Sequence, residues 1–102
     1  MSAASIYIRP SLAVLTDRSG QIAVGGTAQV VTLINRDRRY LLIQNTSAGD
    51  LWVNFTATAV VASPSIRIPT GLSLTFENSF VTSEQLSIIG ATTAQTFTAK
   101  EA

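Results

Sequence analysis

Hydrophobic and polar residues alternate along most of this chain, which is the period-two pattern of β-strands that bury one face. The clearest run is LSLTFE, in which Leu72, Leu74 and Phe76 point one way and the polar residues point the other. The same pattern predicts further short strands at residues 6–9, 12–15, 22–24, 40–44, 51–55, 66–68, 86–89 and 95–100. No stretch keeps the period of a helix, and at most one helical turn is expected, near Ser83 and Glu84.

Two stretches depart from simple alternation. TAQVVTLI, from Thr27 to Ile34, is apolar and β-branched on both faces, which predicts a central strand covered on both sides. TATAVVASPS, residues 56–65, predicts a loop or an irregular edge. Within it, ATAVVA (57–62) is either an exposed interaction patch or a buried edge strand.

Turn sequences separate the predicted strands. They are DRSG (17–20), GG (25–26), NRDRR (35–39), NTSAGD (45–50) and PTG (69–71). Short strands between turn signals about every 8 to 12 residues predict an all-β fold, an antiparallel β-sandwich or small barrel, jelly-roll-like. We expect a single domain over residues 10–102, preceded by an arm at residues 1–9.

The stretch from Arg38 to Phe55 is predicted to be a hairpin with its turn at NTSAGD. Its second strand sets Leu51, Val53 and Phe55 on one face, so Trp52 lies on the other. If the first face is core, Trp52 points outward as an interface anchor or a sugar-stacking platform. If both faces are covered, Trp52 is an ordinary core residue.

Arg36, Asp37, Arg38 and Arg39 form the strongest cluster of charge in the chain. One hypothesis is that these arginines dock onto an acidic partner surface. The alternative is a solvated turn whose arginine stems lie over apolar neighbours.

Composition limits the classes of function. Hydrophobic residues make up 46% of the 102 residues and charged residues only 13%, against about 25% charged in an ordinary domain. A surface of Thr, Ser and Ala loses little hydration free energy when it is covered by protein. The net charge of +1 argues against nucleic-acid binding, and no apolar run or leader pattern indicates a membrane or secretion, so synthesis in a cytoplasm is expected.

The residues needed for catalysis or metal binding are scarce. There is no His and no Cys, which removes the commonest general base and the thiolate metal ligands. The six carboxylates, Asp17, Asp37, Asp50, Glu77, Glu84 and Glu101, lie in predicted turns, at a strand end or near the C-terminus, and are expected to be solvated. The segment from Val24 to Gln29 lacks the sequence pattern of a phosphate-binding loop. Asn45 and Asn54 begin N-glycosylation sequons, but glycosylation is not expected because no signal peptide is recognised. We therefore expect no enzyme activity, cofactor or metal.

Four stretches resemble small structural proteins of tailed-bacteriophage virions. They are the segment from Arg39 to Phe55, the turn and strand from Pro69 to Glu77, the strand from Leu86 to Gly90, and the TAKE tail from Thr98 to Glu101. The resemblance covers about the last two-thirds of the chain. It rests on residues that form strands and turns, and no catalytic residue is among them. It implies a small β-rich virion protein that decorates or cements a capsid, or that sits at the head–tail neck or tail.

The leading expectation is an oligomeric capsid decoration protein, a trimer by preference, which bridges subunits of the major capsid protein in the virion. Ile6, Tyr7, Ile8 and Arg9 would add a strand to a neighbouring sheet edge, while Arg36, Arg38, Arg39 and Trp52 complete the expected partner-binding residues. A neck or tail component is the alternative. A carbohydrate-binding module that uses Trp52 and Tyr40 is a further alternative, although a chain with one Trp and two Tyr offers few stacking rings.

Overall fold

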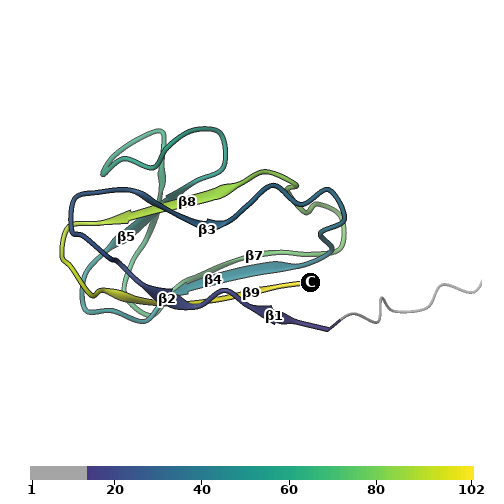
Figure 1. Ribbon diagram of the computed structural model, residues 1–102, viewed down its shortest axis with the longest axis horizontal. Helices are drawn as coiled ribbons and strands as arrows, with labels where there is room; N and C mark the ends of the chain where they lie inside the picture. The colour runs from purple at the N-terminus through teal and green to yellow at the C-terminus, as the bar shows by residue number, and fades with distance from the viewer. Residues whose placement is uncertain (1–13) are drawn as a thin grey trace, which may run out of the picture.

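The computed structural model describes residues 14–102, which fold into two antiparallel sheets packed face to face (Figure 1). The first sheet has the order β1-β9-β4-β7, with β2 also paired to β9, and the second has the order β3-β8-β5-β6. The strands are β1 (Thr16–Asp17), β2 (Gly20–Gln21), β3 (Gln29–Thr32), β4 (Leu41–Asn45), β5 (Leu51–Asn54), β6 (Ile66–Ile68), β7 (Ser73–Phe76), β8 (Leu86–Gly90) and β9 (Thr96–Glu101). Residues 14–102 contain no helix, and neither sheet closes on itself. The predicted all-β sandwich is confirmed, and the barrel alternative is not.

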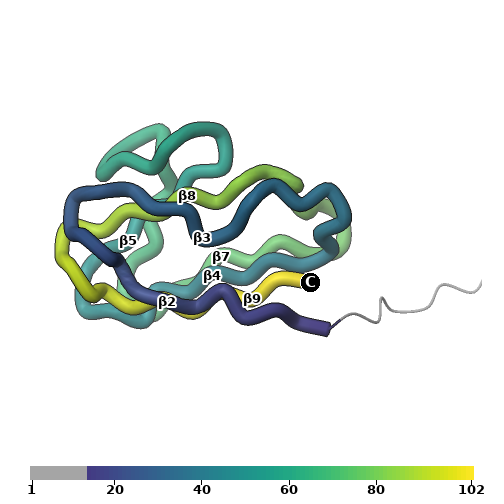
Figure 2. The backbone as a smooth tube through the Cα atoms, viewed as in Figure 1, coloured from purple at the N-terminus to yellow at the C-terminus, as the bar shows by residue number. Residues whose placement is uncertain are grey.

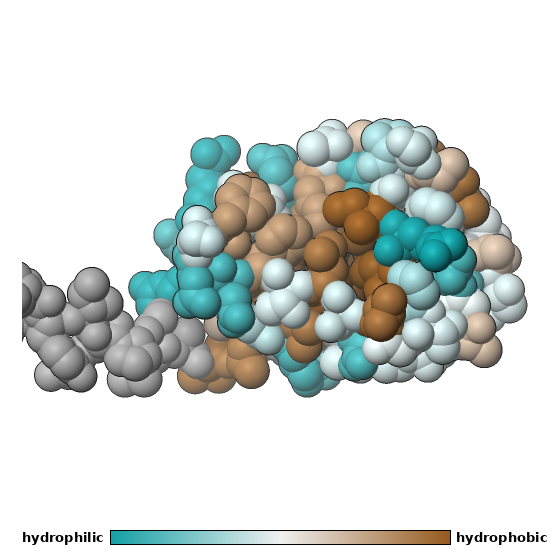
Figure 3. All heavy atoms as spheres, turned by 180° about the vertical axis from the view of Figure 1, so that it is seen from behind, coloured by the Kyte–Doolittle hydropathy of each residue, from teal (hydrophilic) through white to brown (hydrophobic). Residues whose placement is uncertain are grey.

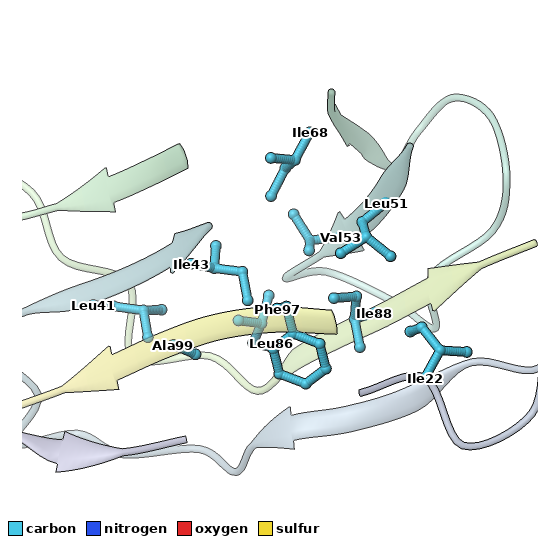
Figure 4. Packing of buried hydrophobic residues seen from close by; sticks show 10 residues of the cluster. All are labelled: Ile22, Leu41, Ile43, Leu51, Val53, Ile68, Leu86, Ile88, Phe97 and Ala99. Atoms are coloured by element: carbon cyan, nitrogen blue, oxygen red, sulfur yellow. The ribbon is translucent and has the colours of Figure 1, made fainter. Parts of the chain in front are cut away.

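The core lies between the sheets and uses alternate residues of each strand (Figure 4). β4 contributes Leu41 and Ile43, and β9 contributes Phe97 and Ala99, all almost fully buried. The opposite sheet and the segment after β2 complete the cluster with Ile22, Leu51, Val53, Ile68, Leu86 and Ile88. This period-two alternation is what the sequence predicts for strands that bury one face.

The predicted hairpin from Arg38 to Phe55 is wrong in its pairing. Both strands exist, but β4 pairs with β7 and β9 in the first sheet, and β5 pairs with β6 and β8 in the second. The NTSAGD turn therefore carries the chain from one layer to the other, and Figure 2 shows this crossing repeated along the chain. Alternation reveals which face of a strand is buried but does not identify its partner strand.

The predicted central strand from Thr27 to Ile34 lies at an edge instead. β3 pairs with β8 alone, and the register shifts between Val30 and Thr32 as in a β-bulge. Leu33 is 68% exposed and Ile34 is 56% exposed. A run that is apolar on both faces predicts a strand covered on both sides by its own domain, but part of this run faces solvent.

The DRSG sequence is also not a turn between two separate hairpin strands. β1 and β2 both pair with β9, so residues 18–19 interrupt a single edge strand. The Arg18 backbone N–H donates to Ala99 O at 2.8 Å, which keeps the interrupted segment attached to β9.

The strand predicted at residues 22–24 is wrong, because β2 ends at Gln21. The strand predicted at residues 12–15 is wrong in its described part, since Val14 and Leu15 precede β1, and the strand predicted at residues 6–9 lies outside the described residues. The other predicted strands agree in place with the observed ones, and residues 56–65 form the predicted loop.

Candidate functional site

The arginine turn does not present three cations to solvent. The side chain of Arg38 is fully buried, and its Nε donates to Glu101 Oε2 at 2.6 Å. Its Nη1 donates to the carbonyls of Thr82 (2.7 Å) and Glu84 (2.9 Å), and its Nη2 donates to Leu33 O at 3.0 Å. Arg38 therefore holds the ends of several loops together and is not placed to dock onto a partner.

Glu101 is the acceptor of this network, and the expectation that it is solvated is wrong. It is 3% exposed, and besides Arg38 it accepts from Thr32 Oγ1 at 3.0 Å and Arg18 Nε at 3.1 Å. Burial by itself raises the pKa of this carboxyl, but the hydrogen bonds from Arg38, Thr32 and Arg18 outweigh burial and hold the pKa below its ordinary value. The network joins β9 of the first sheet to β3 of the second.

The alternation along β9 contains a signal that Glu101 is buried. Phe97 and Ala99 face the core on β9, and Glu101 continues the same face two residues further along. A carboxylate in phase with core residues requires a buried cation, and Arg38 is the buried cation of the described chain.

The other predicted contact residues are distributed over the molecule. Arg36 and Arg39 are exposed, and Trp52 is partly buried on the outer face of the second sheet, opposite the core-facing Leu51 and Val53. In register, Trp52 lies between Arg67 of β6 and Ile89 of β8. Ile6, Tyr7, Ile8 and Arg9 lie outside the described residues. Among the described residues, the structure therefore does not gather the predicted contact residues into one site.

The asparagines of the two Asn-x-Ser/Thr sequences stabilise turns. Asn45 is fully buried, accepts from Ser47 N at 2.8 Å, and donates to the carbonyls of Gly49 and Ile68 at 2.7 Å. Asn54 likewise accepts from Thr56 N at 2.7 Å. In each case the side chain bonds the backbone two residues on, which shapes the turn that follows the strand.

A depression lined by described residues is large enough for a small ligand. It has a volume of about 320 Å³ and lies between residues 47–49 and residues 92–96. Its most buried polar group, the Gln95 amide, already donates to Ser47 Oγ and Asp50 O and accepts from Thr92 N. With the amide already used within the fold, the depression offers little that would select a ligand.

Residues 14–102 also contain no cluster of three His, Cys, Asp or Glu side chains that would hold a metal ion. Every buried side-chain nitrogen or oxygen in this part of the chain has a hydrogen-bond partner.

Exposed apolar side chains are the most prominent surface feature. Those at least 44% exposed are Val14, Leu15, Val24, Val30, Leu33, Ile34, Val60, Val61, Ile66, Leu72 and Phe80. Figure 1 places β1, β2 and β3 toward the viewer, so the view from behind in Figure 3 faces the opposite edges of the sheets. On that face brown side chains gather into a band between hydrophilic ones (Figure 3). Exposed apolar area of this kind marks surfaces that bind protein.

Comparison with models of known protein families, with curated proteins and with solved structures finds no match for this chain. Within residues 14–102 there is no helix with the length and hydrophobicity needed to cross a membrane.

Proposed function

We propose that this protein is a non-enzymatic structural subunit that associates with copies of itself and with other protein surfaces. The observation that carries the proposal is the number of large apolar side chains left exposed on a fold with a complete core. Covering them stabilises an assembly by about 25 cal/mol for each Å² of apolar surface removed from water. The low content of charged residues, 13%, keeps the desolvation cost of such contacts small.

Within this class we propose a capsid decoration protein of a tailed bacteriophage, found in the virion and made in the bacterial cytoplasm. The resemblance of residues 39–55, 69–77, 86–90 and 98–101 to virion structural proteins supports this assignment. Copies would associate, as a trimer by preference, and bridge subunits of the major capsid protein. Arg36 is exposed and is a candidate for contact with acidic capsid residues.

The test is co-sedimentation of the purified protein with expanded capsids of the phage whose genome encodes it. We expect saturable binding at a fixed ratio to the capsid subunit and a higher temperature of capsid disruption. Absence of binding, together with incorporation into purified tails, would favour the neck or tail alternative.

A carbohydrate-binding module is the second candidate function, and one observation supports it. Trp52 lies on the outer face of a sheet with Arg67 beside it in register, a polar neighbour that sugar sites use. Binding to a glycan array that Trp52→Ala abolishes would support this candidate over the assembly role.

A further inference from the structure

Four apolar side chains are exposed at the end of the sandwich where the described chain begins. Val14 and Leu15, just before β1, are 90% and 54% exposed, and Leu33 and Ile34, just after β3, are 68% and 56% exposed. We call these four residues the front patch, because β1 and β3 lie toward the viewer in Figure 1. The patch spans the side of the sandwich where the edge strands of the two sheets face each other.

The Glu101 carboxylate shows that the two halves of the front patch are neighbours. Thr16, the first residue of β1, pairs with Glu101 in register. Glu101 Oε1 accepts from Arg18 Nε at 3.1 Å and from Thr32 Oγ1, at the end of β3, at 3.0 Å. The start of β1 and the end of β3 therefore meet at one carboxylate, and the exposed side chains beside them lie at the same end of the molecule.

The sequence pattern predicts that this part of the chain is covered. The run from Thr27 to Ile34 is apolar on both faces, which is typical of a strand covered on both sides. Residues 14–102 pair β3 with β8 alone and leave Leu33 and Ile34 more than half exposed. The cover that the pattern predicts therefore comes from outside residues 14–102.

Side chains and not backbone groups are what the front patch offers to such a cover. The register of β3 with β8 is shifted as in a β-bulge, a feature that opposes the addition of a further strand. Beyond β3, Leu33 O accepts from Arg38 Nη2 at 3.0 Å and the Asn35 N–H donates to Ser83 O at 2.9 Å. These backbone groups are used within the fold, so an occupant of the patch packs against it and does not extend the sheet.

We propose that residues 6–12 of the chain's own N-terminal segment fold over this side of the sandwich and pack on the front patch. The segment reads IYIRPSL, and its Ile6, Ile8 and Leu12 supply the apolar side chains. It is attached at Val14, which is itself part of the patch.

The topology supports this direction for the segment. From β2 to β5, each strand lies in the sheet opposite to the one before it, and the same holds from β6 to β9. A segment that precedes β1 and continues this alternation crosses from the first sheet to the side of the second. The edge strand of the second sheet on that side is β3, which ends at the front patch.

The length of the chain allows the crossing and favours the chain's own segment over a second copy. Six residue steps join Val14 to Ile8 and span at most about 20 Å when extended, whereas facing sheets lie about 10 Å apart. A segment on so short a link has an effective concentration on the order of millimolar at the patch. A second copy would have to reach a comparable concentration in solution to displace it.

The proposal goes beyond the assembly role and leaves surface available for it. Leu72 and Phe80 flank β7 at the opposite edge of the first sheet, and they stay exposed when the front patch is covered. Capsid co-sedimentation tests the decoration role, whereas the experiments below test the position of the segment. Either proposal can therefore fail without the other.

The first experiment uses the absence of cysteine from this chain. A variant with Ile8→Cys and Leu33→Cys places one thiol on the segment and one on the front patch. The matched control combines Ile8→Cys with Asp17→Cys, because Asp17 is closer to Ile8 along the chain but pairs with Lys100 on the outer face of the first sheet. Under mild oxidation we expect the first pair to form an intramolecular disulfide about 10-fold faster than the control pair, as measured by mass spectrometry.

The dependence of this rate on protein concentration distinguishes the occupants. Docking of the chain's own segment gives a disulfide within one chain, at a rate independent of concentration. A disulfide between two chains, formed faster at higher concentration, would assign the patch to a second copy. Equal rates for the two cysteine pairs would show that the segment has no preference for the patch. Either of the last two outcomes overturns the proposal.

A second experiment needs no cysteine and measures cleavage after Tyr7 by chymotrypsin. Ile34→Asp should accelerate this cleavage about 10-fold, because cleavage follows the population of the undocked segment. Val24→Asp is the matched control, since Val24 is 57% exposed, as Ile34 is 56% exposed, but lies between β2 and β3 at the other end of the sandwich. The control should be cleaved at the wild-type rate. Equal rates in all three proteins would contradict docking on the front patch.

Discussion

At the scale of single residues, the fold depends on a few polar groups placed where apolar ones would be expected. The Arg38 guanidinium and the Glu101 carboxylate are the clearest case, since both are buried and every bond they make joins different segments. Removing one partner of a buried ion pair leaves an uncompensated buried charge, which strongly destabilises the fold. Replacing both partners with well-packed apolar residues changes the free energy of unfolding much less.

Glu101→Gln should therefore lower the free energy of unfolding by about 3 kcal/mol, since Arg38 remains charged and buried without its counter-ion. Urea unfolding checks this value. Glu84→Gln, at an exposed carboxylate, is the matched control and should change stability by less than about 0.5 kcal/mol. A similar small loss for both variants would show that the buried pair contributes little.

Acid should destabilise the protein through the same carboxyl. The pKa of Glu101 is lowered in the folded state, so its contribution is fully present above the unfolded-state pKa and is lost as pH falls through the folded-state pKa. Asp17 adds to the same trend, because bonds from Ser19 and Lys100 lower its pKa to about 2. Thermal unfolding between pH 6 and pH 2 should show a steep decline below about pH 4.5. The decline should be shallower in Glu101→Gln, and an unchanged slope would contradict this assignment.

At the scale of elements, the sequence predicts strands well and their partners poorly. β7, β8 and β9 lie where the alternation places them, because alternation is a local consequence of burying one face. The pairing of β4 with β9 joins residues more than fifty positions apart, and no local pattern encodes it. The sequence also presented Glu101 as a solvated charge, since carboxylates are rarely buried without a partner and the partner is distant in the chain.

The turn from β4 to β5 shows that a local sequence pattern can predict a turn without predicting which sheet the next strand joins. NTSAGD was correctly predicted as a turn, but the buried Asn45 side chain makes it a crossing between layers by bonding Gly49 O and Ile68 O. These two carbonyls belong to different segments, so one amide holds the crossing to the strand β6 of the opposite sheet.

Asn45→Ala should lower stability by about 3 kcal/mol, because two carbonyls and the Ser47 amide lose their partner in a buried environment. Chemical denaturation measures the loss. Gln44→Ala is the neighbouring control, since Gln44 lies on the outer face with one long bond to Gly71 O at 3.4 Å, and its effect should be within about 0.5 kcal/mol. Equal effects would mean that the crossing does not depend on Asn45.

At the scale of the whole molecule, a complete core coexists with a surface that retains much apolar area. The buried cluster has partners from both sheets, so the exposed Leu33, Ile34, Leu72 and Phe80 are not needed to close it. A chain of this composition gains free energy by covering such residues with protein, which is the physical basis of the proposed assembly role.

Association should therefore stabilise the fold in a concentration-dependent way. We expect the Tm to rise with protein concentration, since the associated state binds only folded chains. Apolar contacts predominate on this surface, so the rise should persist in 0.5 M salt, where exposed ion pairs are largely screened. Differential scanning calorimetry at several concentrations tests this. A Tm independent of concentration would argue against self-association.

The position of β9 has a consequence for how the protein acquires its structure. β9 lies between β4 and the β1–β2 edge in the first sheet. Because β9 is the last of the described strands, β1 and β2 cannot join this sheet until β9 has emerged from the ribosome. Until then β4 and β7 can pair with each other, but the apolar faces of Leu41 and Ile43 lack Phe97 and Ala99. Nonlocal closure of this kind slows folding to milliseconds or longer. During this period β4 can pair with strands of other nascent chains. Synthesis at high local concentration should therefore favour aggregation at this stage over any later one.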